Sequence, residues 1–132
     1  MTSSRRSVTS GAEWESRYGY HRAVAVDGRA WVSGTTASSR GGEPDPDAAV
    51  QTRTAFAIAL ASLAELGFEK ADVVRTRMYV TESVAADLVG SVHGEVFGGV
   101  NPAATLVCVS GLIDPRLKVE VELEAVKGGN GT

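Results

Sequence analysis

The sequence predicts an α+β domain in which two helices pack on one face of a mixed β-sheet. Short segments rich in β-branched residues alternate between apolar and polar positions near both ends of the chain and in its middle. Two segments with apolar residues three and four positions apart lie between them, which gives the order β-β-β-α-β-α-β-β. We expect one domain over residues 1–132, with residues 1–5 and 127–132 flexible.

The N-terminal part of the chain is expected to form three strands. The first strand covers 6–10 and the second covers 20–26. Asp27-Gly28 is a strong signal for a two-residue hairpin turn, so the third strand, 29–35, should return antiparallel to the second.

A long helix follows the turn-rich loop 38–47. Asp47 can cap its N-terminus at Ala48, and Gly67 can close it as the residue beyond the C-cap. Apolar side chains recur along this segment at helical spacing, at Phe56, Ile58, Ala59, Leu60, Leu63 and Leu66. The period and both helix ends therefore agree.

The next two elements are a strand over 73–81 and a helix over 84–97. Alternation along the strand predicts two faces, with Val74, Thr76, Met78 and Val80 on one and Val73, Arg75, Arg77 and Tyr79 on the other. Ser83 can cap the helix and Gly98-Gly99 can end it. The apolar stripe expected along the helix is Val84, Leu88, Val92 and Phe97.

Two further strands, 104–112 and 117–126, complete the sheet around a turn at Asp114-Pro115. The last strand alternates strictly, with Val119, Val121 and Leu123 on one face and Glu120, Glu122 and Glu124 on the other. Three carboxylates on one face are too many to bury unpaired, yet the neighbouring strands are too apolar for a freely solvated face. Assembly of several subunits through this face would resolve the conflict.

The composition narrows the class of protein. Hydrophobic residues make up 43% and charged residues 22% of the chain, which is typical of a globular domain. A net charge of −3 without a basic patch disfavours nucleic-acid binding. A single cysteine without Cys/His ligand spacing argues against a disulfide or a metal site. No signal sequence and no apolar run of the ~20 residues that a membrane span needs are visible, so we expect a cytoplasmic protein.

Several stretches, taken together and in order, resemble the Rid family, the reactive intermediate deaminases of the YjgF/RidA type. These stretches are GYHRAVAVDGRAWVSGT, ADVVRTRMYVT, HGEVFGGVNPAATLVCVSGL and VEVELEA. The resemblance covers residues 6–126. It implies a chorismate-mutase-like fold, a homotrimer, and small-molecule ligands held in clefts between subunits. It also implies hydrolysis of reactive enamines and imines to ketones and ammonia, with no metal or cofactor.

The resemblance carries specific roles over to matching positions. Tyr20 matches the family's cleft tyrosine, and Ser33-Gly34 match a Ser-Gly pair whose backbone binds the ligand. Thr35 follows this pair and can reach the same space. Glu120 matches the glutamate that holds the attacking water; Glu122 is an alternative, because the turn before the last strand is about one residue longer than in RidA.

One position departs from the family pattern. The family signature is Pro-Ala-Arg-(Ser/Thr), and its arginine clamps the substrate carboxylate, but here Ala104 precedes Thr105. Alanine donates no hydrogen bond, and loss of a charged partner in a cleft costs about two decades in rate or affinity. If position 104 faces the cleft, Leu106 and Cys108 share its side and give it an apolar wall with one thiol. The alternative is packing in the core or at a subunit interface, which is the favoured interpretation for Cys108.

Other polar residues also have two interpretations. Arg75 or Arg77 could replace the missing arginine, or could pair with the glutamates of the last strand. Ser91 stands where relatives carry an asparagine on the second helix and is included among the ligand-binding candidates. His93 could transfer protons, although contact between helices is favoured for it.

Two functions from different classes remain. One is a cofactor-independent enzyme that hydrolyses or tautomerises an enamine, an imine or a related reactive metabolite, with standard 2-aminoacrylate deamination disfavoured by Ala104. The other is a non-catalytic small-molecule-binding or regulatory protein on the same scaffold. An endoribonuclease label also attaches to the family, but an acidic chain without a basic groove argues against it.

Overall fold

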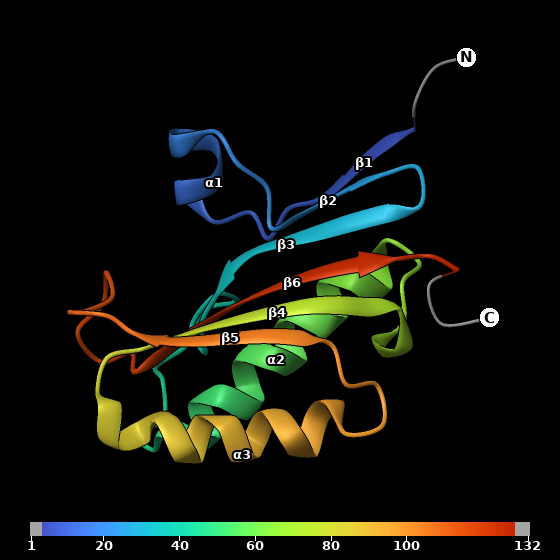
Figure 1. Ribbon diagram of the computed structural model, residues 1–132. Helices are drawn as coiled ribbons and strands as arrows, with labels where there is room; N and C mark the ends of the chain where they lie inside the picture. Colours follow the sequence, from blue (N-terminus) through green and yellow to red (C-terminus); the bar gives the residue numbers. More distant parts are fainter. Residues whose placement is uncertain (1–3, 129–132) are drawn as a thin grey trace.

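The computed structural model describes residues 4–128, which contain one six-stranded sheet with helices packed on it (Figure 1). The strands are β1 (Arg5–Val8), β2 (Ala23–Val26), β3 (Arg29–Thr35), β4 (Val73–Val80), β5 (Ala103–Cys108) and β6 (Val119–Val126). Their order across the sheet is β1-β2-β3-β6-β4-β5. All neighbouring strands are antiparallel except β4 and β5, which run parallel. The last strand of the chain therefore lies in the middle of the sheet.

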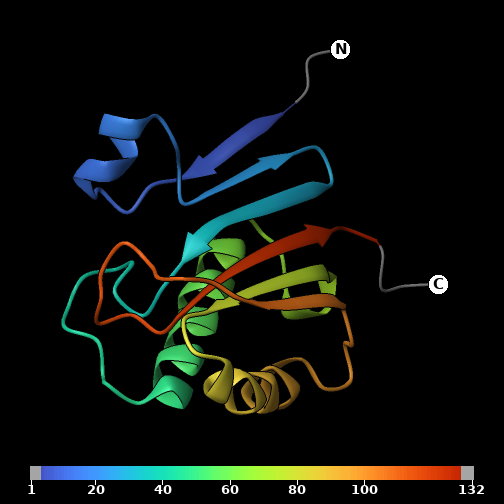
Figure 2. The same cartoon turned by 60° about the vertical axis from the view of Figure 1, so that its left-hand side comes forward.

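Two long helices, α2 (Ala48–Glu65) and α3 (Ala86–Phe97), cover one face of the sheet (Figures 1 and 2). The predicted α+β arrangement, with two helices on one face of a mixed sheet, is confirmed. The sequence did not predict a third helix, α1 (Glu13–Tyr18), which stands apart from the helical layer beside the β1–β3 end of the sheet. Six residues are too few to show a helical period.

The core lies between the sheet and the helical layer. Val119, Val121 and Leu123 of β6 are at most 1% exposed, and they belong to one buried cluster with Phe56 and Leu63 of α2. Full burial of such a side chain stabilises the fold by about 1.5–3 kcal/mol. The strict alternation predicted for the last strand is confirmed, and it leaves the three glutamates of β6 on the face without helices.

The predicted ends of α2 are confirmed. The Oδ1 atom of Asp47 accepts hydrogen bonds from the backbone N–H groups of Ala49 (2.7 Å) and Val50 (3.2 Å), so it caps two of the free donors of the first turn. Gly67 follows the last turn with φ +86°, a conformation that glycine adopts at little cost.

The predicted start and stripe of the second long helix are partly wrong. Residues Ser83–Ala85 form a separate 3-10 turn, and no side chain caps α3, which begins at Ala86. The turn holds Val84 outside the helix, where it is 83% exposed, and Leu88 is half-exposed. Val92 and Phe97 are buried as predicted, and Val89 is the third buried residue of this helix.

A β-bulge changes the two faces of β4 at its start. Val73 pairs with Ala125, whereas Arg75 pairs with Glu124, so Val74 is an extra residue on this strand. Val73 therefore faces the core and Val74 is exposed, the reverse of the prediction. From Arg75 onward the predicted alternation is correct.

Several predicted strand boundaries also shift. β1 ends at Val8 rather than at residue 10, β2 begins at Ala23 rather than at residue 20, and β5 ends at Cys108 rather than at residue 112. Of the predicted tail residues, Arg5 belongs to β1, and the Lys127 backbone N–H donates to the Gly28 carbonyl at 2.7 Å. The rest of the predicted tails, apart from Ser4 and Gly128, lies outside the described residues. Within residues 4–128, no helix is both long and apolar enough to cross a membrane.

Candidate functional site

A pocket of about 350 Å³ opens on the helix-free face, where β3 and β4 end and β6 begins. Glu120 and Glu122 of β6 and Tyr79 of β4 line it, together with Gly34 near the end of β3. The loop after β5 closes one side with Val109, Gly111 and Leu112. The pocket thus combines two carboxylates and a phenol with a wall that is apolar or has no side chain.

Gly34 and Glu120 lie directly against each other. A Cβ atom at position 34 would collide with the Oε2 atom of Glu120, so any other residue there would have to displace the end of this side chain. The register of the two strands shifts between Val32 and Thr35, which marks an irregularity of β3 at this point. The structure therefore brings together two of the residues that the sequence predicted for the site, and the missing side chain of Gly34 leaves the space that the carboxylate occupies.

Burial raises the pKa of Glu120, and the charge of Glu122 raises it further, while the guanidinium of Arg22 acts in the opposite direction. The balance leaves the pKa of Glu120 above its ordinary value. A carboxyl group of this kind can accept or return a proton closer to neutral pH than an exposed glutamate can.

Tyr79 and Glu122 form a second pair in the same pocket. The Tyr79 hydroxyl donates a hydrogen bond to Glu122 Oε1, and this bond, with burial, raises the pKa of Tyr79. No role in the site was predicted for Tyr79. The alternation of β4 could have indicated one, because it puts Tyr79 on the same face as Arg77, and Tyr79 pairs with Glu120 of β6.

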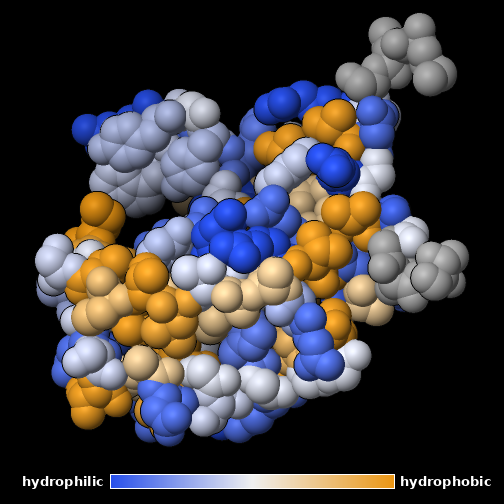
Figure 3. All heavy atoms as spheres, viewed as in Figure 1, coloured by the Kyte–Doolittle hydropathy of each residue, from blue (hydrophilic) through white to orange (hydrophobic). Residues whose placement is uncertain are grey.

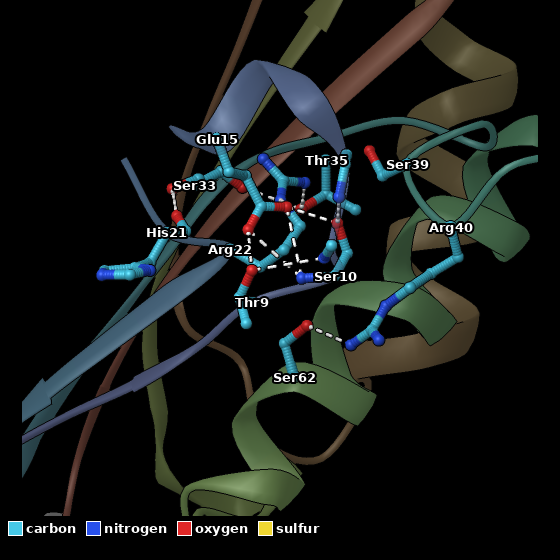
Figure 4. A network of polar contacts seen from close by, with 12 residues as sticks. Thr9, Ser10, Glu15, His21, Arg22, Ser33, Thr35, Ser39, Arg40 and Ser62 are labelled. Atoms are coloured by element: carbon cyan, nitrogen blue, oxygen red, sulfur yellow. Dashed lines mark hydrogen bonds and ion pairs between the residues drawn. The ribbon is translucent and has the colours of Figure 1, made fainter. Parts of the chain in front are cut away.

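Thr35 and Tyr20 contact the buried guanidinium of Arg22. Ser33 bonds instead to the backbone of His21 and Arg22 (Figure 4). The Ser33 hydroxyl donates to the His21 carbonyl (2.6 Å), and the Ser33 N–H donates to the Arg22 carbonyl (2.9 Å). Both donors of Ser33 are therefore occupied inside the chain. The sequence analysis did not identify Arg22, because an arginine beside a hairpin strand has no special pattern.

The residues around Ala104 lie on the other side of the sheet from Glu120. In the parallel β4–β5 pairing, Ala104, Leu106 and Cys108 stand beside Thr76, Met78 and Val80, whose side chains face the helices. Leu106 packs against the core, and Cys108 is exposed. Within one chain, the predicted apolar wall and the predicted catalytic glutamate are therefore not parts of one pocket.

Thr105 and both strand arginines lie on the helix-free face. Arg77 forms an ion pair with Glu124, in which Arg77 Nη1 lies 2.7 Å from Glu124 Oε2. The NH2 atom of Arg75 donates to the Thr105 hydroxyl at 2.7 Å. Neither arginine lines the pocket that contains Glu120.

Two helix residues complete the list of candidates. Ser91 is exposed on α3, in the helical layer. His93 shares a hydrogen bond of 2.8 Å with the Thr76 hydroxyl and packs edge-on against Phe56, so it joins α3 to the sheet and to α2. Among residues 4–128, no three His, Cys, Asp or Glu side chains lie together in a way that could hold a metal ion.

The surface over the middle of the sheet is hydrophilic, and hydrophobic side chains lie to both sides of it (Figure 3). A second hollow of about 270 Å³ on this face is lined in part by Trp31, Arg77 and Glu124. Trp31 and Val107 are about 40% exposed here. Aromatic and charged groups therefore alternate across a broad face with no helix over it.

Comparison with known proteins places this chain in a family. The sequence profile of the endoribonuclease L-PSP family matches residues 11–127. Protein SCO2049 of Streptomyces coelicolor is 44% identical over 126 residues, which cover 93% of this chain and 92% of that protein.

Solved structures agree with this match. Rv2704 of Mycobacterium tuberculosis, a member of the YjgF/YER057c/UK114 family, is 42% identical with a TM-score of 0.86, over 93% of this chain and 99% of that one. TM0215 of Thermotoga maritima is 26% identical with a TM-score of 0.80, over 93% of each chain. The chain therefore belongs to the endoribonuclease L-PSP family, the YjgF/Rid group that its sequence resembles.

Proposed function

We propose that the protein is a Rid-type enzyme that hydrolyses or tautomerises an imine or enamine lacking a carboxylate. The observation that carries the proposal is the half-buried Glu120 carboxylate, which lies against Gly34 in a pocket lined by Tyr79 and Glu122. Family membership supports a function with small molecules. The reaction class is what the family resemblance implies for a site with these residues.

The chemistry requires one water and one proton acceptor. Glu120 accepts a proton from the water while the water oxygen bonds to the imine carbon, and it returns this proton to the imine nitrogen. Cleavage of the carbon–nitrogen bond, with transfer of the hydroxyl proton to the nitrogen, then releases ammonia and leaves a carbonyl group. The Gly34 backbone lies beside the carboxylate and would steady the charge that develops on the substrate.

The absence of a carboxylate on the substrate follows from charge. Ala104 supplies no guanidinium, and the lining of the Glu120 pocket includes two carboxylates but no arginine or lysine. Arg77 is neutralised by Glu124. A neutral or protonated imine suits such a pocket better than an anion does.

A homotrimer with clefts between subunits is part of the proposal. Ala104 and Glu120 face opposite sides of the sheet in one chain. Both can line one cleft only if neighbouring subunits contribute one residue each. An exposed sheet face that carries Trp31 and Val107 beside paired charges is consistent with contact between subunits.

The test generates imines with and without a carboxylate. An amine oxidase acting on benzylamine supplies the first kind, and an amino-acid oxidase supplies 2-imino acids; release of aldehyde or ketone is followed with and without the protein. We expect acceleration of the first reaction and little of the second. Glu120→Gln should abolish the acceleration, and Glu95→Gln, an exposed change on α3, should not. No acceleration of any imine would overturn the proposal.

A second function, a small-molecule-binding or regulatory protein, is favoured by the same loss of the charged anchor at position 104. Ligand binding that survives in Glu120→Gln, with no turnover by the wild-type protein, would support it. We do not propose an endoribonuclease, because the chain is acidic, with a net charge of −3. Strong salt-dependent RNA binding would contradict that choice.

A further inference from the structure

Glu15 of α1 and Arg22, just before β2, form a buried ion pair next to the candidate site. Their side chains are 4% and 6% exposed, and Arg22 Nε lies 3.6 Å from Glu15 Oε2. Two charges are costly to bury, and the cost is offset only when further hydrogen bonds satisfy both groups. Both side chains of this pair therefore need further hydrogen-bond partners.

Arg22 contacts three of the residues that the sequence predicted for ligand binding. Its Nη2 atom donates to the Gly34 carbonyl at 2.9 Å, and its Nη1 atom donates to the Thr35 hydroxyl at 3.4 Å. Its guanidinium carbon also lies 5.6 Å from the centroid of the Tyr20 ring, within the range of a cation–π contact. One guanidinium therefore joins the segments of Tyr20 and of Gly34.

Glu15 is held just as firmly from the other side (Figure 4). It accepts hydrogen bonds from the Thr9 hydroxyl (2.7 Å), from the Ser10 N–H (3.2 Å) and from the Ser10 hydroxyl. Burial raises the pKa of Glu15, but the hydrogen bonds from Ser10 and Thr9 and the charge of Arg22 lower it more. Glu15 is therefore ionised at neutral pH and fixes the position of Arg22.

We propose that Glu15 and Arg22 are positioning residues of the candidate site, which hold the backbone of Ser33 and Gly34 against Glu120 and set the charge that Glu120 experiences. Arg22 acts through the Gly34 carbonyl, which belongs to the residue that touches the Glu120 carboxylate. Glu15 acts through Arg22, because it neutralises part of that positive charge and orients the guanidinium.

Glu120 is surrounded by few ionisable groups, which makes the electrostatic part testable. Arg22 faces it from the segment before β2, Tyr79 from β4, and Glu122 from its own strand. Arg22 is the cation among them and lowers the pKa of Glu120, whereas Glu15 offsets part of the Arg22 charge. Loss of Arg22 and loss of the Glu15 charge should therefore shift the titration of Glu120 in opposite directions.

The first experiment titrates Glu120 by carboxyl-carbon NMR in the substrate-free protein. Arg22→Met should move the titration of Glu120 to higher pH, because a nearby positive charge is lost. Glu15→Gln should move it to lower pH, because Arg22 is no longer neutralised. Arg53→Met and Glu95→Gln are the matched controls, since they remove the partners of an exposed ion pair between α2 and α3. Shifts in the same direction, or none in either variant, would overturn the electrostatic part.

The second experiment separates position from charge. Arg22→Lys keeps the positive charge but cannot donate to Gly34 and Thr35 in the same fork-like geometry. The titration of Glu120 should therefore stay close to that of the wild-type protein. In contrast, kcat for imine hydrolysis should fall about tenfold to a hundredfold, since misplaced reacting groups cost that much. Unchanged kcat would overturn the positioning role.

The outcome is distinguishable from that of the proposed function, on which the kinetic part of this inference rests. If the wild-type protein hydrolyses no imine, the proposed function fails, while the NMR titration still decides whether the pair controls Glu120. If Arg22→Met does not fold by circular dichroism, Glu15→Gln decides the electrostatic part: a shift to lower pH supports it and no shift overturns it.

Discussion

Gly34 leaves room on the helix-free face of the sheet for the carboxylate of Glu120. Its missing side chain leaves the space that Glu120 Oε2 occupies, and its carbonyl receives Arg22. The site is therefore built from backbone and neighbouring charges as much as from reactive side chains. Changes at this position should affect Glu120 before they affect the rest of the fold.

We expect Gly34→Ala to reduce imine hydrolysis about a hundredfold, because the new methyl group must displace the Glu120 carboxylate. Steady-state kinetics with the benzylamine-derived imine would measure the loss. Gly28→Ala is the control, because a Cβ there meets only the Lys127 side chain, at 3.7 Å. Equal losses in both variants would contradict the steric argument.

Ala104→Arg tests the departure from the family signature. Restoring a guanidinium should raise kcat/KM for 2-imino acids about tenfold to a hundredfold, since a charge-assisted hydrogen bond contributes about 1.5–3 kcal/mol. The imine without a carboxylate should gain nothing. Ala104→Met controls for the length of the side chain, and a similar gain in this variant would argue against carboxylate recognition.

At the scale of elements, the ends and the period of α2 show how local signals determine structure. Asp47 satisfies two backbone donors at the N-terminus, and Gly67 supplies the positive φ beyond the C-terminus. Neither feature depends on the rest of the molecule, which explains why both could be predicted from neighbouring residues alone.

We expect Asp47→Ala to lower the free energy of unfolding by about 1 kcal/mol, because the cap of α2 is lost. Urea denaturation followed by circular dichroism would measure the change. Asp47→Asn keeps an acceptor oxygen in the same place and should retain most of the stability. A loss in the asparagine variant as large as in the alanine variant would point to the charge rather than to the cap.

Elements that depend on contacts between distant segments were harder to predict. The bulge at Val74 arises from pairing with β6, some fifty residues away, and no local pattern signals it. Glu15 and Arg22 depend on a short helix and a buried pair, whereas sequence reasoning expects charged residues to be solvated. Gly34 and Glu120 were found through family resemblance, and their direct contact became visible only in the folded chain.

At the scale of the whole molecule, His93 links the helical layer to the sheet. Burial lowers its pKa below the ordinary value of 6.5. The unfolded chain therefore takes up a proton near pH 6.5, while the folded chain does so only at lower pH. In that window the unfolded state binds more protons, so stability must fall as the pH falls.

The expected outcome is a lower urea midpoint at pH 5.5 than at pH 7.5. His93→Gln removes the titrating group and should reduce this difference between the two pH values, whatever it does to stability as such. His21→Gln is the matched control, because it removes an imidazole that lies outside the helical layer. An unchanged pH dependence in His93→Gln would show that other groups cause it.

Association of subunits is the second property at this scale. We expect sedimentation equilibrium to give three times the chain mass of 13.7 kDa. Trp31→Glu, placed on the helix-free face, should weaken the assembly, because it adds a charge where an aromatic ring is half-exposed. Val84→Glu, on the 3-10 turn before α3, is the control. A monomer at micromolar concentration would contradict the proposed trimer.

The central place of β6 has a consequence for biosynthesis. β6 pairs with β3 on one side and with β4 on the other, and within residues 4–128 no other strand pairing joins the two halves of the sheet. During translation the β2–β3 hairpin and the β4–β5 pair therefore cannot join into one sheet until β6 leaves the ribosome. Until then their apolar sides stay partly uncovered. A chain stalled before residue 119 would be a substrate for chaperones or proteases, and the emergence of β6 would be the event that closes the domain.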